Sequence, residues 1–360
     1  MFLQVLESRR HIQVEISETV MMLDKVRILA RYGMTHMKQN VARTAGFSIA
    51  GPSVHTFHSM AKIQIQKQGP LDLSYDVIKS DTPRNGDVKK PGPPIIILHG
   101  LFGNKLNNRS IGRNLNKRLG RDVYLLDLRN HGSSPHSPVH NYGAMSEDVK
   151  RFITKHELNT QGGPIIVGHS MGGKVAMMLV LKNPQLCSMM VCIENAPVSL
   201  RPNAKFVEYI RALLEIVNDN GKTIQTLKQA DEHLAERIGG NELVRRFLLT
   251  TLKRAKADGA SGASSYTFQE RIPLGTLRDA IVKGEIAAWP LDPTHERWTR
   301  PALFIRATQS QYVVDEYLPL IGAFFPRFET RDIDAGHWVN AEKPGECAEN
   351  IAEFVERHED

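Results

Sequence analysis

Short apolar runs alternate with amphipathic stretches from about Pro93 to the C-terminus. Such runs are typical of buried strands, and apolar residues repeating every three or four positions are typical of helices. The pattern predicts strands over 95–98, 123–128, 164–167, 189–193, 301–306 and 328–333, and helices over 109–119, 145–156, 171–181, 316–324 and 345–357. This alternation favours an α/β fold with a mostly parallel, doubly wound sheet.

The alternation stops between about 199 and 296, where the sequence becomes strongly helical. Helices are expected over 206–217, 224–238, 241–256 and near 277–283, with a Gly/Ser/Ala linker over 258–265. A helical insertion into such a sheet predicts a cap over an active site, although an extra helical layer stays open as an alternative. The predicted organisation is an N-terminal extension over 1–65, core segments over 66–198 and 299–360, and a cap over 199–298.

Composition permits a substantial core, because 41% of the 360 residues are apolar and 24% are charged. The longest uninterrupted apolar run covers only the seven residues 175–181. A membrane-spanning helix needs roughly 18 to 20 such residues. We therefore expect a soluble protein without a transmembrane segment.

The net charge of +7 comes from one N-terminal stretch. Residues 25–71 contain seven Lys and Arg and no Asp or Glu, and without these seven, 39 basic residues remain against 39 acidic ones. A nucleic-acid surface on the folded domain is therefore not expected. The stretch resembles a mitochondrial presequence, which predicts a mitochondrial protein. A solvated tail on a cytoplasmic protein is the alternative. A start at Met21 or Met22 would remove Glu7, Glu15 and Glu18, which precede the stretch.

Cysteine usage argues against a disulfide framework and against a zinc site. The chain has three cysteines, Cys187, Cys192 and Cys347, and they are widely spaced. This indicates a reducing compartment. No phosphate-binding, dinucleotide-binding or metal-ligand spacing is present, so neither a cofactor nor a metal is expected.

The strongest chemical signal is Gly168-His169-Ser170-Met171-Gly172, which follows a predicted buried strand and precedes a predicted helix. A nucleophile elbow has this G-x-S-x-G pattern because side chains two positions from the serine would clash with the tight turn. Ser170 is therefore the predicted nucleophile.

Two further motifs supply the oxyanion hole and the general base that a serine nucleophile needs. In His99-Gly100-Leu101-Phe102-Gly103, the N–H of Leu101 is expected to form an oxyanion hole with the N–H of Met171. His337, in a Gly-flanked turn 167 residues after Ser170, is the predicted general base. His99, His131 and His169 are rivals, but the first two are expected to bond backbone in turns and the third lies within the elbow.

The acid that orients the base has two candidates in the order Ser, acid, His. Glu194 follows the strand after the nucleophile helix, and Asp315 follows the strand over 301–306. Either carboxylate can hold the imidazole in one tautomer and stabilise its positive form. From the residues alone, Glu194 and Asp315 are equally good candidates for the acid.

These motifs resemble the α/β-hydrolase-fold serine esterases, in the branch of the YbfF-type esterases, the mitochondrial abhydrolase-domain proteins and the fungal alcohol acetyltransferases. The resemblance runs from about Pro93 to the C-terminus and lies in 99–103, 127–132, 168–174, 312–313 and 336–339. In that branch an aspartate 24 positions after the serine is the acid. The resemblance therefore implies Glu194, with glutamate in place of aspartate.

The predicted function is acyl transfer through a Ser170 acyl-enzyme with small ester, thioester or alcohol substrates. The resemblance implies acetyl-CoA as donor substrate and an alcohol as acceptor, with hydrolysis of the same acyl-enzyme. The alternatives are an esterase or thioesterase only, a non-catalytic binding protein of the same fold, or a cofactor-free enzyme such as a carbon–carbon bond hydrolase.

Overall fold

The computed structural model describes residues 69–80, 92–160, 162–200, 204–256 and 266–359. The predicted extension over 1–65 and the predicted linker over 258–265 lie outside these ranges. Within them, no helix is both long and apolar enough to span a bilayer.

A seven-stranded sheet forms the centre of the fold, in the order β1-β3-β2-β4-β5-β8-β9. Only β1 runs antiparallel to its neighbour, and the other strands are parallel. The strands are β1 (Tyr75–Ile78), β2 (Ile95–Leu98), β3 (Val123–Leu126), β4 (Ile165–His169), β5 (Met189–Ile193), β8 (Ala302–Ala307) and β9 (Phe328–Ile333).

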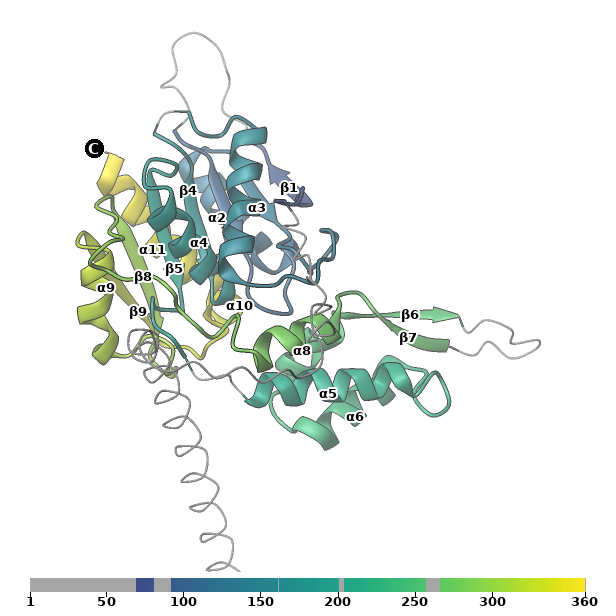
Figure 1. Ribbon diagram of the computed structural model, residues 1–360. Helices are drawn as coiled ribbons and strands as arrows, with labels where there is room; N and C mark the ends of the chain where they lie inside the picture. Colours follow the sequence, from purple (N-terminus) through teal and green to yellow (C-terminus); the bar gives the residue numbers. More distant parts are fainter. Residues whose placement is uncertain (1–68, 81–91, 161, 201–203, 257–265, 360) are drawn as a thin grey trace, which may run out of the picture. The chain divides into compact units, whose positions relative to one another are not determined.

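The sheet is buried on both faces because successive side chains of a strand point to opposite sides. In β2, Ile96 and Leu98 join the core that contains residues of α3 (Tyr142–Lys155) and α4 (Met171–Lys182). Ile95 and Ile97 join a second core with α2 (Arg109–Leu119) and α11 (Pro344–Glu359). Figure 1 shows α3 and α4 on one side of the sheet. The central strands β2, β3, β4 and β5 are therefore buried along their whole length, whereas the edge strands β1 and β9 are partly exposed.

The predicted doubly wound architecture is confirmed. The helix over 109–119 and the strands over 95–98, 189–193 and 328–333 have the predicted bounds, and the other core elements differ at their ends by a few residues. The segment predicted as a helix over 316–324 is a short 3-10 turn η2 (Asp315–Tyr317) followed by α9 (Leu318–Phe324). Three short elements outside the insertion were not predicted: β1, η1 (Lys105–Asn108) and α10 (Val339–Glu342).

Between β5 and β8 the chain forms four helices and a hairpin among the described residues, and Figure 1 shows α5, α6 and α8 beyond one end of the sheet. The helices are α5 (Ala204–Asn218), α6 (Leu227–Ile238), α7 (Glu242–Leu249) and α8 (Leu274–Val282), and the hairpin strands are β6 (Leu252–Lys256) and β7 (Tyr266–Glu270).

The predicted helix over 241–256 is wrong in its second half. The helix α7 ends at Leu249, and β6 pairs antiparallel with β7 from Leu252–Glu270 to Lys256–Tyr266. The residues of β6 are good helix formers, but the partner strand satisfies their backbone groups instead. Tertiary pairing overrides local propensity here.

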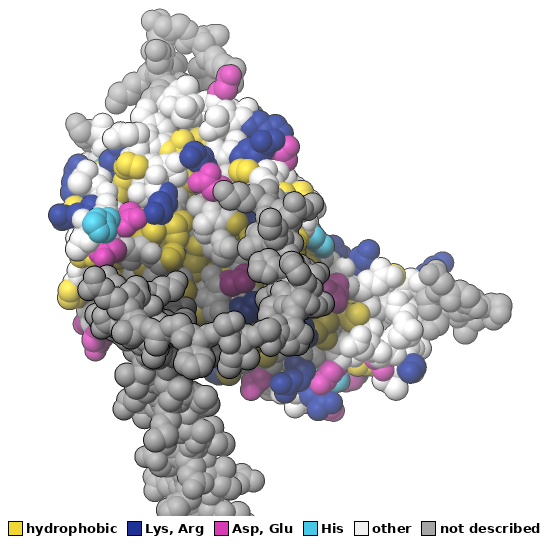
Figure 2. Space-filling model, viewed as in Figure 1, with side chains coloured by type: hydrophobic (Ala, Val, Ile, Leu, Met, Phe, Trp, Pro, Cys, Tyr) yellow, Lys and Arg dark blue, Asp and Glu magenta, His cyan; other side chains and the backbone are white. Residues whose placement is uncertain are grey.

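Charges of both signs share the molecular surface. On the face drawn in Figure 2, Lys and Arg side chains lie interspersed with Asp and Glu. Surface ion pairs join segments distant in sequence, such as Arg118 with Glu356 at 2.8 Å. Exposed pairs of this kind contribute little to stability individually.

Candidate active site

Ser170 occupies a sharp turn between β4 and α4. Its backbone has φ 52° and ψ −114°, which is strained for a residue with a side chain. The Ser170 N–H donates to the carbonyl of Ile193 at 2.8 Å, which fixes the turn to the neighbouring strand β5. The turn thus presents the hydroxyl at the carboxyl end of the sheet, as a nucleophile elbow requires.

The glycines around Ser170 leave no room for side chains. A Cβ on Gly168 would lie 2.1 Å from the Gly172 carbonyl oxygen, and one on Gly172 would lie 2.6 Å from the His99 carbonyl oxygen. All of these contacts are with backbone, which cannot move without opening the turn. The close packing of this turn therefore requires glycine at both positions.

We expect Gly168→Ala to destabilise the fold by about 2 kcal/mol or more, because the added methyl group overlaps backbone atoms of the turn. Urea unfolding followed by circular dichroism measures the change. The matched control is Gly275→Ala in α8, where an added Cβ meets nothing within 4 Å. That variant should be as stable as the parent or slightly more stable. Equal stability of the two variants would contradict the account of the turn.

His337 and Glu194 extend a hydrogen-bonded chain from Ser170. The Nε2 atom of His337 lies 3.0 Å from Ser170 Oγ, and its Nδ1 atom lies 3.2 Å from Glu194 Oε2. Tyr312 stacks on the imidazole, with ring centroids 3.9 Å apart and 21° between the planes. His169 reaches back from the elbow, with its Nε2 3.0 Å from the His337 carbonyl oxygen. Tyr312 therefore contacts the imidazole of His337, and His169 contacts its backbone.

The Glu194 carboxylate is fully buried and fixed by the end of β8. Its Oε1 accepts from the Ala307 N–H at 2.6 Å, which leaves Oε2 directed at His337. Glu194 has φ 59°, and its own N–H donates to the Ile305 carbonyl at 2.9 Å. The bend after β5 and these two hydrogen bonds therefore tie Glu194 to β8.

Asp315, the other candidate acid, lies elsewhere. Its side chain is 82% exposed and pairs with Arg306 at 2.5 Å. Arg306 also pairs with Asp332 at 2.6 Å, so Asp315 belongs to a surface ion-pair network. Of the two candidates, the structure brings only Glu194 to His337.

Leu101 and Met171 line the cavity that adjoins Ser170 and are both buried. Met171 is the first residue of α4, so its N–H has no partner one helical turn earlier. Among the described residues, the N–H of Leu101 has no hydrogen-bond acceptor either. Within the part of the chain that the structure describes, the backbone N–H groups of these two cavity-lining residues are thus available as donors.

His99 and His131 hold the loop that carries Leu101. The N–H groups of Leu128 and Phe102 donate to Nε2 of His99 and His131, at 3.0 and 3.1 Å. Each Nδ1–H must then donate in turn, to the carbonyls of Gly100 and Arg129 respectively. Burial lowers the pKa of both rings, which keeps them neutral. Their role is to bond backbone, as the turn positions predicted.

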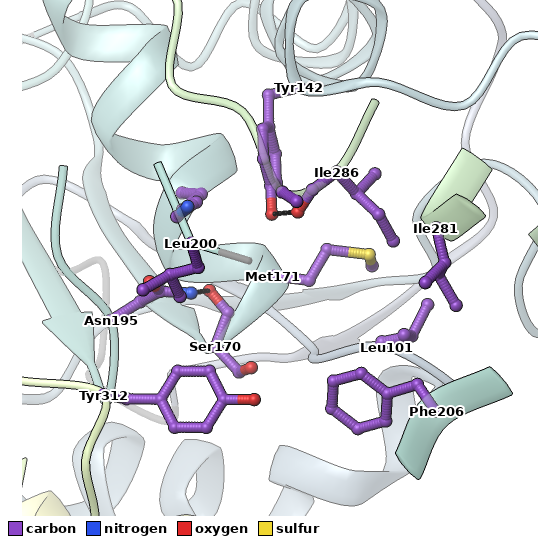
Figure 3. A pocket seen from close by; sticks show the side chains of 12 residues that line it. Leu101, Tyr142, Ser170, Met171, Asn195, Leu200, Phe206, Ile281, Ile286 and Tyr312 are labelled. Carbon is purple, nitrogen blue, oxygen red and sulfur yellow. Dashed lines mark hydrogen bonds between the residues drawn. The ribbon is translucent and has the colours of Figure 1, made fainter. Parts of the chain in front are cut away.

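A cavity of about 60 Å³ adjoins the Ser170 hydroxyl, and Figure 3 shows it from close by. The Tyr142 hydroxyl donates to the Ile286 carbonyl at 2.5 Å, and the Asn195 amide donates to the Ser170 carbonyl at 3.0 Å. Most of the lining is apolar: Leu101, Met171, Leu200, Phe206, Ile281, Ile286 and Ala287. Of these residues, Phe206 lies on α5 and Ile281 on α8 of the insertion. The insertion thus closes one side of the site.

Several lining residues were not predicted as part of the site. Tyr142 and Phe206 lie at helical positions whose spacing is explained equally well by core packing. Tyr312 belongs to the 312–313 motif of the family resemblance, which gave it no predicted role. Among the described residues, no group of three or more His, Cys, Asp or Glu side chains is arranged to hold a metal ion.

Comparison with known proteins identifies the family. The family model of the alpha/beta hydrolase fold matches residues 93–344. The chain belongs to the α/β-hydrolase family. This confirms the predicted fold class and the predicted family resemblance.

Relatives of this α/β-hydrolase include enzymes of acyl transfer and of ester hydrolysis. It is 80% identical over 342 residues to a probable alcohol acetyltransferase of Saccharomyces cerevisiae, covering 95% of this chain and 100% of the relative. It is 34% identical over 288 residues to the sn-1-specific diacylglycerol lipase ABHD11 of Xenopus tropicalis, covering 79% of this chain and 82% of the relative. A solved marine microorganism esterase has a TM-score of 0.66 and 32% identity, covering 79% of this chain and 99% of that structure.

Proposed function

We propose that this α/β-hydrolase is a serine acyltransferase that works through an acyl-enzyme on Ser170. The observation that carries the proposal is the chain of contacts from Ser170 Oγ through the His337 imidazole to the buried Glu194 carboxylate. A serine hydroxyl becomes nucleophilic when a neighbouring base accepts its proton. The spacing of these three side chains suits that proton transfer.

Acylation begins when Ser170 Oγ attacks the carbonyl carbon of an ester or thioester while His337 Nε2 takes its proton. The carbonyl oxygen becomes negative and is held by the N–H groups of Leu101 and Met171. Glu194 stabilises the imidazolium through Nδ1–H. The carbon–oxygen or carbon–sulfur bond then breaks, and His337 returns the proton to the leaving group. An alcohol or water repeats the sequence in reverse to release the acyl group.

We further propose an acetyl group as the acyl group and an alcohol as the acceptor. The 80% identity to a probable alcohol acetyltransferase supports this choice. The cavity beside Ser170 has room for only a few water-sized groups, which suits a short acyl chain. Acetyl-CoA is then a donor substrate and not a resident cofactor.

Hydrolysis of the same acyl-enzyme is the second candidate, giving esterase or thioesterase activity. The lipase and esterase relatives support it. Both reactions share every residue of the site and differ only in whether water or an alcohol attacks the acyl-enzyme. The balance depends on how well the lining from α5 and α8 excludes water.

Purified protein with acetyl-CoA, in the presence and absence of ethanol, tests the proposal. We expect CoA release in both reactions and ethyl acetate in the presence of ethanol, measured by thiol titration and gas chromatography. CoA release without ester would leave hydrolysis as the function. Absence of both products would contradict acyl transfer from acetyl-CoA.

We also propose a mitochondrial location, supported by the acid-free basic stretch over 25–71. N-terminal sequencing of the protein isolated from cells tests it. A cleaved N-terminus within or after this stretch is expected, and an intact Met1 would contradict import with cleavage.

A further inference from the structure

Lys174 is a buried cation beside the site, and the mechanism above does not use it. It lies four residues after Ser170 on α4, so the two residues share one face of the helix. Helical side chains lean toward the N-terminus of their helix, which directs Lys174 toward the Ser170 end. Lys174 is only 1% exposed and lines the cavity that adjoins Ser170.

The contacts of Lys174 do not neutralise its charge. Its Nζ donates to the Val198 carbonyl at 2.7 Å and lies 5.4 Å from the centre of the Tyr142 ring. Among the described residues, no carboxylate oxygen lies within 4.0 Å of this Nζ, and the nearby Glu194 carboxylate is engaged with Ala307 and His337. An ammonium has three hydrogens to donate, and the Val198 carbonyl accepts one of them.

A buried ammonium without a counterion is costly, and a neutral side chain of the same length would fill the space at lower cost. Burial lowers the pKa of Lys174 to about 8, so the side chain still carries most of its charge at neutral pH. A buried ammonium beside the cavity, bonded among the described residues only to a neutral carbonyl, still has hydrogens to donate to an anionic ligand.

We propose that Lys174 forms an anion subsite of the acyl cavity, which holds the free carboxylate of an acyl group derived from a short dicarboxylic acid. The proposal rests on the proposed function, because the acyl group must be attached to Ser170. The carboxylate would accept hydrogen bonds from the free Nζ–H groups while the ester or thioester carbonyl faces Leu101 and Met171. The enzyme then handles such acyl groups in addition to acetyl.

The test compares thioesters of equal carbon number, succinyl-CoA with butyryl-CoA and malonyl-CoA with propionyl-CoA, by the rate of CoA release. We expect the parent enzyme to favour the carboxylate-bearing member of at least one pair, and Lys174→Met to lower that preference by about tenfold or more. The ratio within each pair is the readout, because a general loss of activity in Lys174→Met lowers the turnover of both members. Lys182→Met, at the exposed end of the same helix, is the matched control and should keep the parent preference.

The pH dependence of the preference separates binding from a structural role. The ratio of kcat/KM values within a pair should fall as the pH rises through about 8, because Lys174 loses its charge. The titratable groups near it are Tyr142 of α3, Cys192 of β5 and Tyr312 across the cavity. Burial raises the pKa of Tyr142 and Cys192, so both stay neutral in this range. A protonation step that both members of a pair share cancels in the ratio.

Three results would overturn the proposal. Equal turnover of both members of each pair by the parent enzyme is the first. A Lys174→Met variant that loses stability but retains the parent preference is the second, because Lys174 would then be a structural tie to Val198. If acetyl-CoA is turned over but no carboxylate-bearing thioester is, the anion subsite is wrong and the proposed function stands. If acetyl-CoA is not turned over either, the proposed function fails as well.

Discussion

The Ser170→Ala enzyme loses at least about a thousandfold in kcat/KM for acetyl transfer, since no other group replaces the hydroxyl that forms the acyl-enzyme. The oxyanion donors and the cavity remain, so a small residual rate above the uncatalysed reaction is expected. CoA release from acetyl-CoA measures the loss. The substitution removes one oxygen atom and should leave the fold and its unfolding midpoint close to those of the parent.

Ser133→Ala is the matched control for this variant, because Ser133 is exposed and bonds Asp127 only through its backbone N–H. It should retain parent activity. A Ser170→Ala enzyme that keeps more than about a tenth of parent activity would show that the hydroxyl of Ser170 is not the nucleophile.

Glu194→Gln is expected to lower kcat by about a thousandfold to ten-thousandfold with a smaller change in KM. The amide oxygen can still accept from the Ala307 N–H, so the bend after β5 is preserved. The amide NH₂ then faces His337 Nδ1 and donates to it, which places the imidazole hydrogen on Nε2. In that tautomer His337 cannot accept the proton of Ser170.

Asp315→Asn separates the two candidate acids. Asp315 is exposed and pairs with Arg306, so this variant should remain within about twofold of parent kcat. Steady-state kinetics with acetyl-CoA decides between them. Loss of activity in Asp315→Asn together with an active Glu194→Gln enzyme would reverse the assignment.

Sequence patterns predicted the elements whose residues are apolar all round or strictly periodic. The buried strand β2 and the amphipathic helix α2 have the predicted bounds because each is specified by its own residues. The edge strand β1 is short and half-exposed, so it has no such pattern. The strand β6 depends on its pairing with β7, which local propensity does not record.

Some residues of the candidate site could likewise be predicted from the sequence, and others could not. Ser170 and His337 lie in motifs whose glycines and spacing indicate chemistry, and the structure has them 3.0 Å apart. The choice between Glu194 and Asp315 could not be made from the residues alone, because both follow strand ends. It depends on Ala307 of the adjacent strand β8 holding one carboxylate in place. The stacking of Tyr312 on His337 likewise exists only after folding.

The proposed mechanism requires a covalent acyl group on Ser170. Purified protein is mixed with acetyl-CoA, quenched in acid within the first turnovers and digested for mass spectrometry, with the Ser170→Ala variant treated in parallel. One acetyl group is expected on the peptide that contains Ser170 in the parent and none in the variant. Acetyl transfer without acetylation of Ser170, or acetylation at another residue that is needed for turnover, would contradict it.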